Sequence, residues 1–348
     1  MLRQTDTRSL HWADKTMSVL RADQLEACEK DLAGLPSRCL FEPECSNLEA
    51  EKLYELSFCA EEDRRAAGRM LHPVLHTVEE LRNRVLDTFA AETALLSVEE
   101  HDLLVRAVLF GGRTPLTDWN ELLPARGLVR RLWCRVENVG ENALLVLPSQ
   151  LCATVLMLLA GEDHRNIRTL VESFHNTIDN ALYLLGAVRV TGLQNYMLSG
   201  LESTSAAGQT VLVERFLLAG YDYVYDRSGN LLLIHPGLAD PERMMGIAGA
   251  DMNPEDINSA SESINDLESP LYEKMLSLLQ GSNRPEISPE DAVEDLIILA
   301  KQEVPLKDMQ EVLSSLLICQ STPKMRSALK DLSDRVPRWL GLSTSRVQ

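Results

Sequence analysis

Six cysteine and histidine residues between positions 28 and 76 have side chains of the types that bind metal ions. They are Cys28, Cys39, Cys45, Cys59, His72 and His76. Structural zinc sites bring together four thiolate or imidazole ligands, commonly from pairs separated by about two to four residues. The gaps here are longer, no C-x-x-C pair occurs, and Pro73 indicates a helix start between the two histidines. We therefore expect ordinary buried thiols and surface imidazoles, with no metal and no cofactor.

The sequence contains no motif that is typical of a catalytic site. It has no G-x-S-x-G nucleophile elbow, no phosphate-binding loop ending in Gly-Lys-Ser/Thr, no H-E-x-x-H and no G-x-G-x-x-G after a strand. His101 and Asp102 are neighbours in the sequence, and neighbours on a helix point apart. No nucleophile is paired with a base, so we expect that the chain is not an enzyme.

A cluster of arginines lies between positions 103 and 136: Arg106, Arg113, Arg126, Arg130, Arg131 and Arg135. The same stretch holds two acids, Asp118 and Glu121, so its formal charge is +4. Three of the arginines, at 126, 130 and 131, fall on a short expected helix. Arginine binds phosphate and guanine through paired hydrogen bonds, which favours DNA. Alternatively, the cluster pairs with carboxylates of this chain or of a partner. The sequence leaves both interpretations open.

Three tyrosines alternate with other residues in the stretch YDYVYD. Tyr221, Tyr223 and Tyr225 should share one face of a strand, where they would be core or protein-interface residues. The acids Asp222 and Asp226 outnumber Arg227 around them. On the preceding helix, the formal charges of Glu214 and Arg215 cancel each other. DNA binding without several phosphate contacts gains little affinity, so this hairpin is an unfavourable DNA-binding element.

The middle of the sequence repeats one order of elements, three helices followed by a β-hairpin, which is the order of a winged helix. The first series ends in LLVLPSQL and the second in LLIHPGL, so each hairpin closes on a proline. We predict a mainly α protein with small β-hairpins (α+β). Its expected parts are a helical region over 1–95, winged-helix-like units over 96–160 and 161–246, an acidic linker over 247–270 and a helical region over 271–348.

Composition limits the partners. The formal net charge is −18 and the pI about 4.9, which disfavours nucleic acids and anionic membranes unless a local basic patch exists. The longest apolar stretch, ALLVLPSQLCATVLMLLAG, is divided by Pro148, so no membrane span is expected. The first residues lack the apolar core of a signal peptide, and the seven cysteines are scattered. We expect free thiols in a cytoplasmic protein.

Two stretches, IDNALYLLGAVRVTGLQNYML and LLVLPSQL, together with the tail STPKMRSALKDLSDRVPRWLGLST, resemble uncharacterised bacterial proteins with tandem winged-helix-like units. Some of those proteins continue into a Cys-rich SEC-C zinc motif, which has no counterpart here. The resemblance implies the architecture described above. It covers less than half of the chain, implies no known activity and assigns no functional residue.

The sequence thus favours a non-enzymatic cytoplasmic interaction or regulatory protein that acts on a protein partner through winged-helix-like surfaces. Tyr221, Tyr223 and Tyr225 are its candidate interface residues. The alternative is a DNA-binding transcriptional regulator. Its candidate contacts would be Arg113, Arg126, Arg130, Arg131 and Arg135. Winged helices serve both purposes, so the fold does not decide between them.

Overall fold

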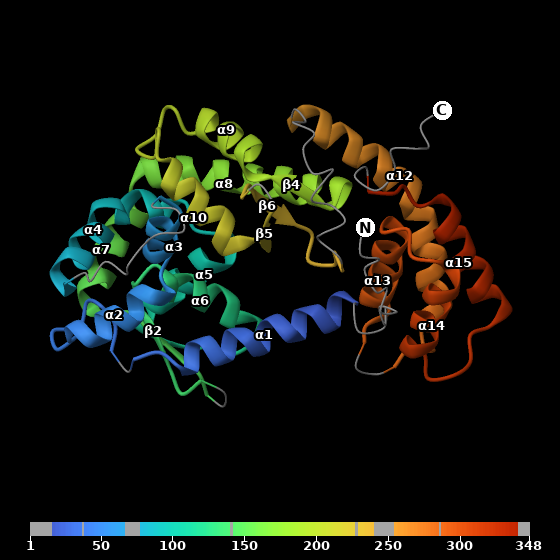
Figure 1. Cartoon of the computed structure of the whole chain (residues 1–348), viewed down its shortest axis with the longest axis horizontal. Coiled ribbons are helices and arrows are strands. Elements are labelled where there is room, and N and C mark those ends of the chain that lie inside the picture. Colours follow the sequence, from blue (N-terminus) through green and yellow to red (C-terminus); the bar gives the residue numbers. More distant parts are fainter. Residues whose placement is uncertain are drawn as a thin grey trace, which may run out of the picture. The chain divides into compact units, whose positions relative to one another are not determined.

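The computed structural model describes residues 16–36, 38–66, 77–139, 142–226, 229–239, 254–284 and 287–339. The chain is mainly helical with two small antiparallel sheets, as the sequence predicts (Figure 1). It divides into two compact units. The first unit comprises Gln24–Asn176 and Val190–Tyr221. The second unit comprises Met1–Asp23, Thr177–Arg189 and Asp222–Gln348.

Among the described residues up to position 94, the helices are α1 (Met17–Ala33), α2 (Asn47–Leu56), α3 (Phe58–Ala66) and α4 (Val78–Ala94). Ser46 and Thr77 each form a capping box with the glutamate three residues later. The alternation of charged residues with leucine over 47–70 predicts a single helix there, and this prediction is wrong because the helix breaks at Ser57. The Ser57 backbone is extended, and its hydroxyl donates to the Tyr54 carbonyl and accepts from the Ala60 amide.

The first series of the repeat lies in the first unit. Its elements are α5 (Val98–Leu109), β1 (Arg113–Pro115), the 3-10 turn η3 (Trp119–Glu121), α6 (Leu122–Arg130), β2 (Arg135–Glu137), β3 (Leu144–Val146) and α7 (Ser149–Leu159). The strands form a sheet in the order β1-β3-β2, with Leu145 opposite both Thr114 and Val136. The sequence predicts the second helix of the series in PLTDWNELL, but this stretch forms only the turn η3 before α6 begins, and strand β1 was not predicted. A glycine is required at Gly112 (φ +91°), because a Cβ there would lie 2.6 Å from the Leu147 carbonyl oxygen.

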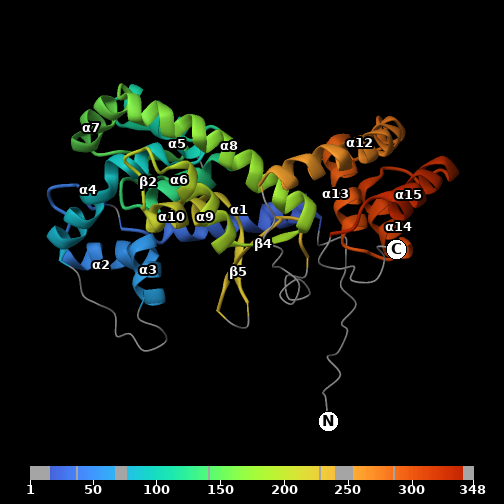
Figure 2. The ribbon, with the colours of Figure 1, turned by 90° about the horizontal axis from the view of Figure 1, so that it is seen from above.

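The second series follows along the chain. Its elements are α8 (Glu162–Leu185), β4 (Ala187–Arg189), α9 (Val190–Gly200), α10 (Thr210–Gly220), β5 (Tyr223–Tyr225) and β6 (Leu231–Ile234). The predicted hairpin is present as β5 and β6, visible as a narrow ribbon in Figure 2. The strand order is β4-β6-β5. The helices α9 and α10 pack together in the first unit, whereas the sheet belongs to the second unit. The linear boundaries given above stay a prediction.

The helices α12 (Pro254–Leu279), α13 (Pro289–Lys301), α14 (Leu306–Leu316) and α15 (Pro323–Arg335) pack against one another in the second unit (Figure 1). The acidic linker expected over 247–270 is wrong from Pro254 onward, where α12 begins. Ile257, Ser261, Glu268 and Leu271 are buried along this helix. Their three- and four-residue spacings, continued at Ile264, place one stripe against the unit, which the many exposed acids conceal in the sequence.

Each unit has its own hydrophobic core. In the first, Trp133 is fully buried and its ring centroid lies 4.6 Å from that of Phe89. In the second, Trp339 is fully buried and its indole N–H donates to the Tyr183 carbonyl. Within the described ranges, no helix combines the length and apolar character needed to cross a membrane.

Candidate functional site

The cysteines of the metal hypothesis that the structure describes are not gathered into a metal site. Cys28, Cys39 and Cys59 are buried, and the Cys28 thiol donates to the Leu122 carbonyl. All seven cysteines are free thiols. In the part of the chain that the structure describes, no three or more His, Cys, Asp or Glu side chains are arranged to hold a metal. His72 and His76 lie outside the described residues.

Every arginine of the basic cluster contacts a carboxylate within the first unit. The pairs are Arg106–Glu121 at 2.7 Å, Arg113–Glu137 at 2.5 Å, Arg126–Asp31 at 2.5 Å, Arg130–Glu61 at 2.6 Å, Arg131–Glu100 at 2.5 Å and Arg135–Glu42 at 3.1 Å. Most of these acids lie on distant parts of the sequence. The structure therefore contains the intramolecular pairing that the sequence left as one of two interpretations.

The centre of this set is buried. The side chain of Arg131, 1% exposed, lies between Glu92 and Glu100, which are each 2% exposed. The Arg131 Nε atom is 3.1 Å from Glu92 Oε1, although the pair is not aligned as a hydrogen bond. Glycine at position 127 permits the contact, because a Cβ there would lie 1.8 Å from Glu100 Oε1. Burial raises the pKa of the Glu100 carboxyl, and Arg131 opposes that shift.

A second arginine extends this network across the first unit. Arg215 of α10 donates to Glu92 at 2.7 Å and to Glu62 at 2.5 Å, and its side chain is 5% exposed. Glu62 also pairs with Arg84. Glu92 thus stands between two buried guanidinium groups. The sequence paired Arg215 with its neighbour Glu214, and only the packing of α3, α4 and α10 identifies the actual partners.

The cluster is consequently a poor DNA-binding surface in this arrangement. A phosphate would have to displace a carboxylate that already neutralises each guanidinium group. Arg131 has almost no accessible surface, and Arg130 is 12% exposed. Arg113 is the most accessible member at 53%, and it too contacts Glu137. The positive charges that cluster in this part of the sequence are therefore largely neutralised by carboxylates that contact them in the folded unit.

Two histidines from α5 and α8 meet inside the first unit. The Nε2 atoms of His101 and His164 are 3.2 Å apart, so one imidazole donates to the other. Burial lowers the pKa of both imidazoles, that of His101 to about 4, and the guanidinium of Arg168 acts in the same direction. The expectation that His101 and Asp102 point apart is wrong, since His101 Nδ1 lies 3.7 Å from Asp102 Oδ1.

The histidine pair should make the first unit sensitive to acid. Its folded-state pKa values lie below the unfolded value of about 6.5, so the stabilisation is present above that pH and is lost as the pH falls toward about 4. Asp102 and Asp163 favour protonation, while Arg168 opposes it. We expect the free energy of unfolding to fall by roughly 2 kcal/mol through this pair.

Urea denaturation at a series of pH values measures this effect. The variant His101→Gln/His164→Gln keeps polar side chains that do not titrate, so its stability should decline less between about pH 7 and pH 4. Identical pH profiles for the variant and the wild-type protein would show that the pair does not carry the acid sensitivity.

The three candidate interface tyrosines do not share a strand. Tyr221 follows α10 in the first unit, and its hydroxyl is 2.6 Å from His175 Nδ1. Tyr223 and Tyr225 lie on β5 in the second unit, with their ring centroids 6.2 Å apart in an edge-on contact. Tyr225 is 40% exposed. The alternation therefore places Tyr223 and Tyr225 correctly on one face of β5. It is wrong for Tyr221, because Tyr221 is the C-cap of α10 and lies before the strand.

The second unit has a buried ionic group that the sequence analysis missed. Lys301 of α13 and Glu268 of α12 are 2.6 Å apart, with side chains 1% and 4% exposed. The Tyr183 hydroxyl donates to the same carboxylate, and Lys301 Nζ lies 3.9 Å from the centre of the Tyr183 ring. Burial lowers the pKa of the Lys301 ammonium, and Glu268 opposes that shift. The arrangement joins three helices of the unit, α8, α12 and α13.

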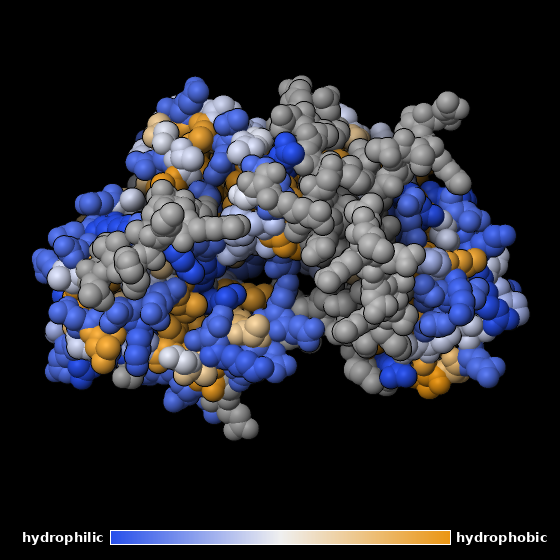
Figure 3. Space-filling model, in the orientation of Figure 1, coloured by the Kyte–Doolittle hydropathy of each residue, from blue (hydrophilic) through white to orange (hydrophobic). Residues whose placement is uncertain are grey.

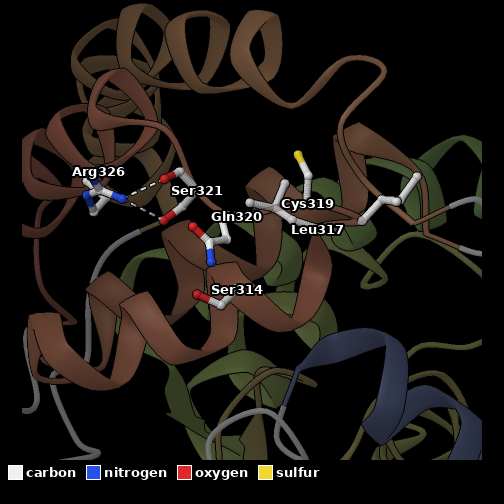
Figure 4. Close-up of a pocket in the computed structure, with 7 residues that line it drawn as sticks. Ser314, Leu317, Cys319, Gln320, Ser321 and Arg326 are labelled. Atoms are coloured by element: carbon white, nitrogen blue, oxygen red, sulfur yellow. Dashed lines mark hydrogen bonds between the residues drawn. The ribbon is translucent and has the colours of Figure 1, made fainter.

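A shallow hollow in the second unit lies between the end of α14 and the start of α15. It is lined by Ser314, Leu317, Ile318, Cys319, Gln320, Ser321 and Arg326. Figure 4 shows the Arg326 guanidinium directed at Ser321, whose carbonyl and hydroxyl oxygens both accept hydrogen bonds from it. The Cys319 sulfur points elsewhere. Since no lining residue is His, Asp or Glu, the hollow offers its thiol and hydroxyls no general base.

One helix of the first unit is apolar on its outer face as well as its inner face. Helix α7 buries Leu151 and Val155, yet Leu156 is 52% exposed and Met157 is 70% exposed. No charged residue occurs between Ala143 and Gly161. On the face shown in Figure 3, hydrophobic residues lie in small patches among hydrophilic ones. An uncharged exposed helix face in a chain with 25% charged residues is a candidate contact surface.

Comparisons of the chain with protein-family models, with curated proteins and with solved structures find no match.

Proposed function

We propose that the chain is a non-enzymatic cytoplasmic protein that binds a protein partner through the outer face of α7. The observation that carries the proposal is the exposure of Leu156 and Met157 on a helix without charge. Exposed apolar surface of this kind is stabilised when a partner removes it from water. The neutralised arginines support a protein partner over nucleic acid.

We further propose that each series of the repeat is a winged-helix-like module. The first series runs helix, strand, short helix, helix, strand, strand, and its third strand is central in the sheet β1-β3-β2. The second series has the same order along the chain and a sheet β4-β6-β5 of the same kind. Repetition of both element order and strand order supports one module used twice. Winged helices bind proteins as well as DNA, so this assignment agrees with the proposed function.

Replacing Leu156 by glutamate should abolish binding of the partner. The substitution places a charge on an exposed apolar face without disturbing the buried side of α7, so the fold should tolerate it. Affinity capture with the tagged protein, followed by mass spectrometry, should lose its specific partner in this variant. Leu48→Glu is the matched control, because Leu48 is 64% exposed on α2. Equal loss in both variants, or in neither, would contradict binding through α7.

Duplex DNA should show no salt-sensitive binding to the wild-type protein. The arginines of the cluster are engaged by carboxylates, so few counterions would be released on contact. Fluorescence anisotropy over a salt titration measures this directly. In Asp31→Asn/Glu137→Gln, where Arg126 and Arg113 lose their partners, weak salt-sensitive binding should appear. Tight wild-type binding that Arg113→Ala/Arg126→Ala removes would instead support the DNA-binding alternative.

A further inference from the structure

Two imidazoles of the first unit face each other near the starts of α5 and α8. The Nε2 atoms of His101 and His164 are 3.2 Å apart, and their ring centroids are 5.3 Å apart. Since the centroids are farther apart than the nitrogens, both Nε2 atoms point into the space between the rings. We propose that this pair binds a divalent transition-metal ion that prefers imidazole, such as zinc, and that the ion joins α5 to α8. The proposal does not depend on the binding of a partner through α7.

The separation of the two nitrogens suits a metal ion as well as a shared proton. A hydrogen bond from nitrogen normally spans about 2.7–3.2 Å, so the distance of 3.2 Å lies at the long end of that range. Zinc lies about 2.0–2.1 Å from an imidazole nitrogen, which puts two nitrogens of one tetrahedral ion about 3.3 Å apart. His101 and His164 would therefore bind a single ion after only small movements of their rings.

The surroundings of the pair favour the tautomers that a metal ion needs. His101 Nδ1 lies 3.7 Å from the Asp102 carboxylate, which favours a proton on Nδ1 and a lone pair on Nε2. In the metal-free pair, His164 then carries its proton on Nε2. Among the described residues, none forms a hydrogen bond with the buried His164 Nδ1 atom. The His164 proton can therefore move to Nδ1 without breaking another hydrogen bond, which leaves both Nε2 lone pairs for one ion.

The charges around the pair are compatible with a bound cation. The Arg168 guanidinium opposes a further positive charge, but it donates to the Leu96 carbonyl just after α4. The carboxylates of Asp102 and Asp163 act on the two imidazoles in the opposite direction from Arg168. The His101 side chain is 17% exposed, so an ion can reach the pair from solvent.

The donor atoms define the kind of ion. Imidazole nitrogens bind zinc, copper and nickel, whereas magnesium and calcium take oxygen ligands. In the described part of the chain, no third His, Cys, Asp or Glu side chain joins the pair, so water would complete the coordination. Binding should therefore be weaker than at a structural zinc site with four protein ligands. The two histidines are 63 residues apart, so the sequence analysis, which expects no metal, does not bring them together.

Calorimetric titration of the full chain with zinc chloride tests the proposal. The wild-type protein should bind one equivalent for which His101→Gln and His164→Gln each lower the affinity by more than about 100-fold, because each removes a ligand. Magnesium chloride should give no such binding. Two control variants, His72→Gln/His76→Gln and Cys319→Ser, remove the other closely spaced histidines and the exposed thiol. Both controls should bind zinc like the wild-type protein.

A third variant keeps both ligands and tests the carboxylate beside them. The Asp102 side chain is 78% exposed, so Asp102→Asn should fold normally and bind zinc roughly 10- to 100-fold more weakly than the wild-type protein. This variant decides the question if circular dichroism shows that the histidine variants do not fold. A bound ion should also raise the melting temperature of the wild-type protein, but not that of His101→Gln or His164→Gln.

Three results would overturn the proposal: a wild-type protein that binds no zinc, zinc binding that both histidine variants retain in full, or wild-type affinity in Asp102→Asn. None of these results affects the binding of a partner through α7, so the two proposals are tested separately.

Discussion

Replacing Glu92 by alanine is expected to destabilise the first unit by about 3–5 kcal/mol, a large fraction of the stability of an ordinary domain. Glu92 is 2% exposed and is the only carboxylate described in contact with both Arg131 and Arg215. Its removal leaves each of these buried guanidinium groups with one carboxylate partner fewer. A cavity left by the deleted side chain adds to the loss.

Chemical denaturation of the full chain, monitored by circular dichroism, measures this loss. Asp87→Ala is the matched control, because Asp87 is exposed on the same helix α4 and its substitution should change the free energy of unfolding by less than about 0.5 kcal/mol. Glu92→Gln should retain the shape of the side chain and still lose much of the stability, which separates the charge from the cavity. A change for Glu92→Ala as small as that for Asp87→Ala would show that the two arginines do not depend on this carboxylate.

The sequence predicts features of the fold that depend on local signals, and it misses features that depend on long-range pairing. The long helices were predictable because capping residues and apolar stripes are local signals, as in the Ser97–Glu100 capping box of α5. Strand β1 was not, because its three residues acquire their structure only by pairing with β3, about 30 residues later. The stretch at η3 was also predicted wrongly, because a segment of so few residues is too short for a helical period to be recognised.

The sequence could predict that the arginines have carboxylate partners, but it could not predict which residues these partners are. The excess of acids in the sequence suggested carboxylate partners for the arginines, yet the actual partner of Arg126 lies 95 residues away and that of Arg215 lies 153 residues away. Distances of this order are set by tertiary packing. Helix α7 posed a different problem, because a stretch that is apolar on all sides gives no signal of which side faces the core.

Replacing Lys301 by methionine is expected to cost the second unit about 3 kcal/mol. Methionine fills nearly the same space, so the loss comes mainly from the charge and not from a cavity. Glu268 would keep only the hydrogen bond from Tyr183 while remaining buried. The cation over the Tyr183 ring would also disappear.

A second substitution distinguishes this cause from general damage to the core. Lys301→Met/Glu268→Gln removes both charges, so it should be more stable than the single variant Lys301→Met, although it carries one more change. Lys307→Met is the control for loss of a lysine, because Lys307 is 84% exposed on α14. If the double variant were as unstable as the sum of the two single variants, the pair would not be coupled. The expected non-additivity follows from a single physical fact, that a buried charge is tolerated only while its partner is present.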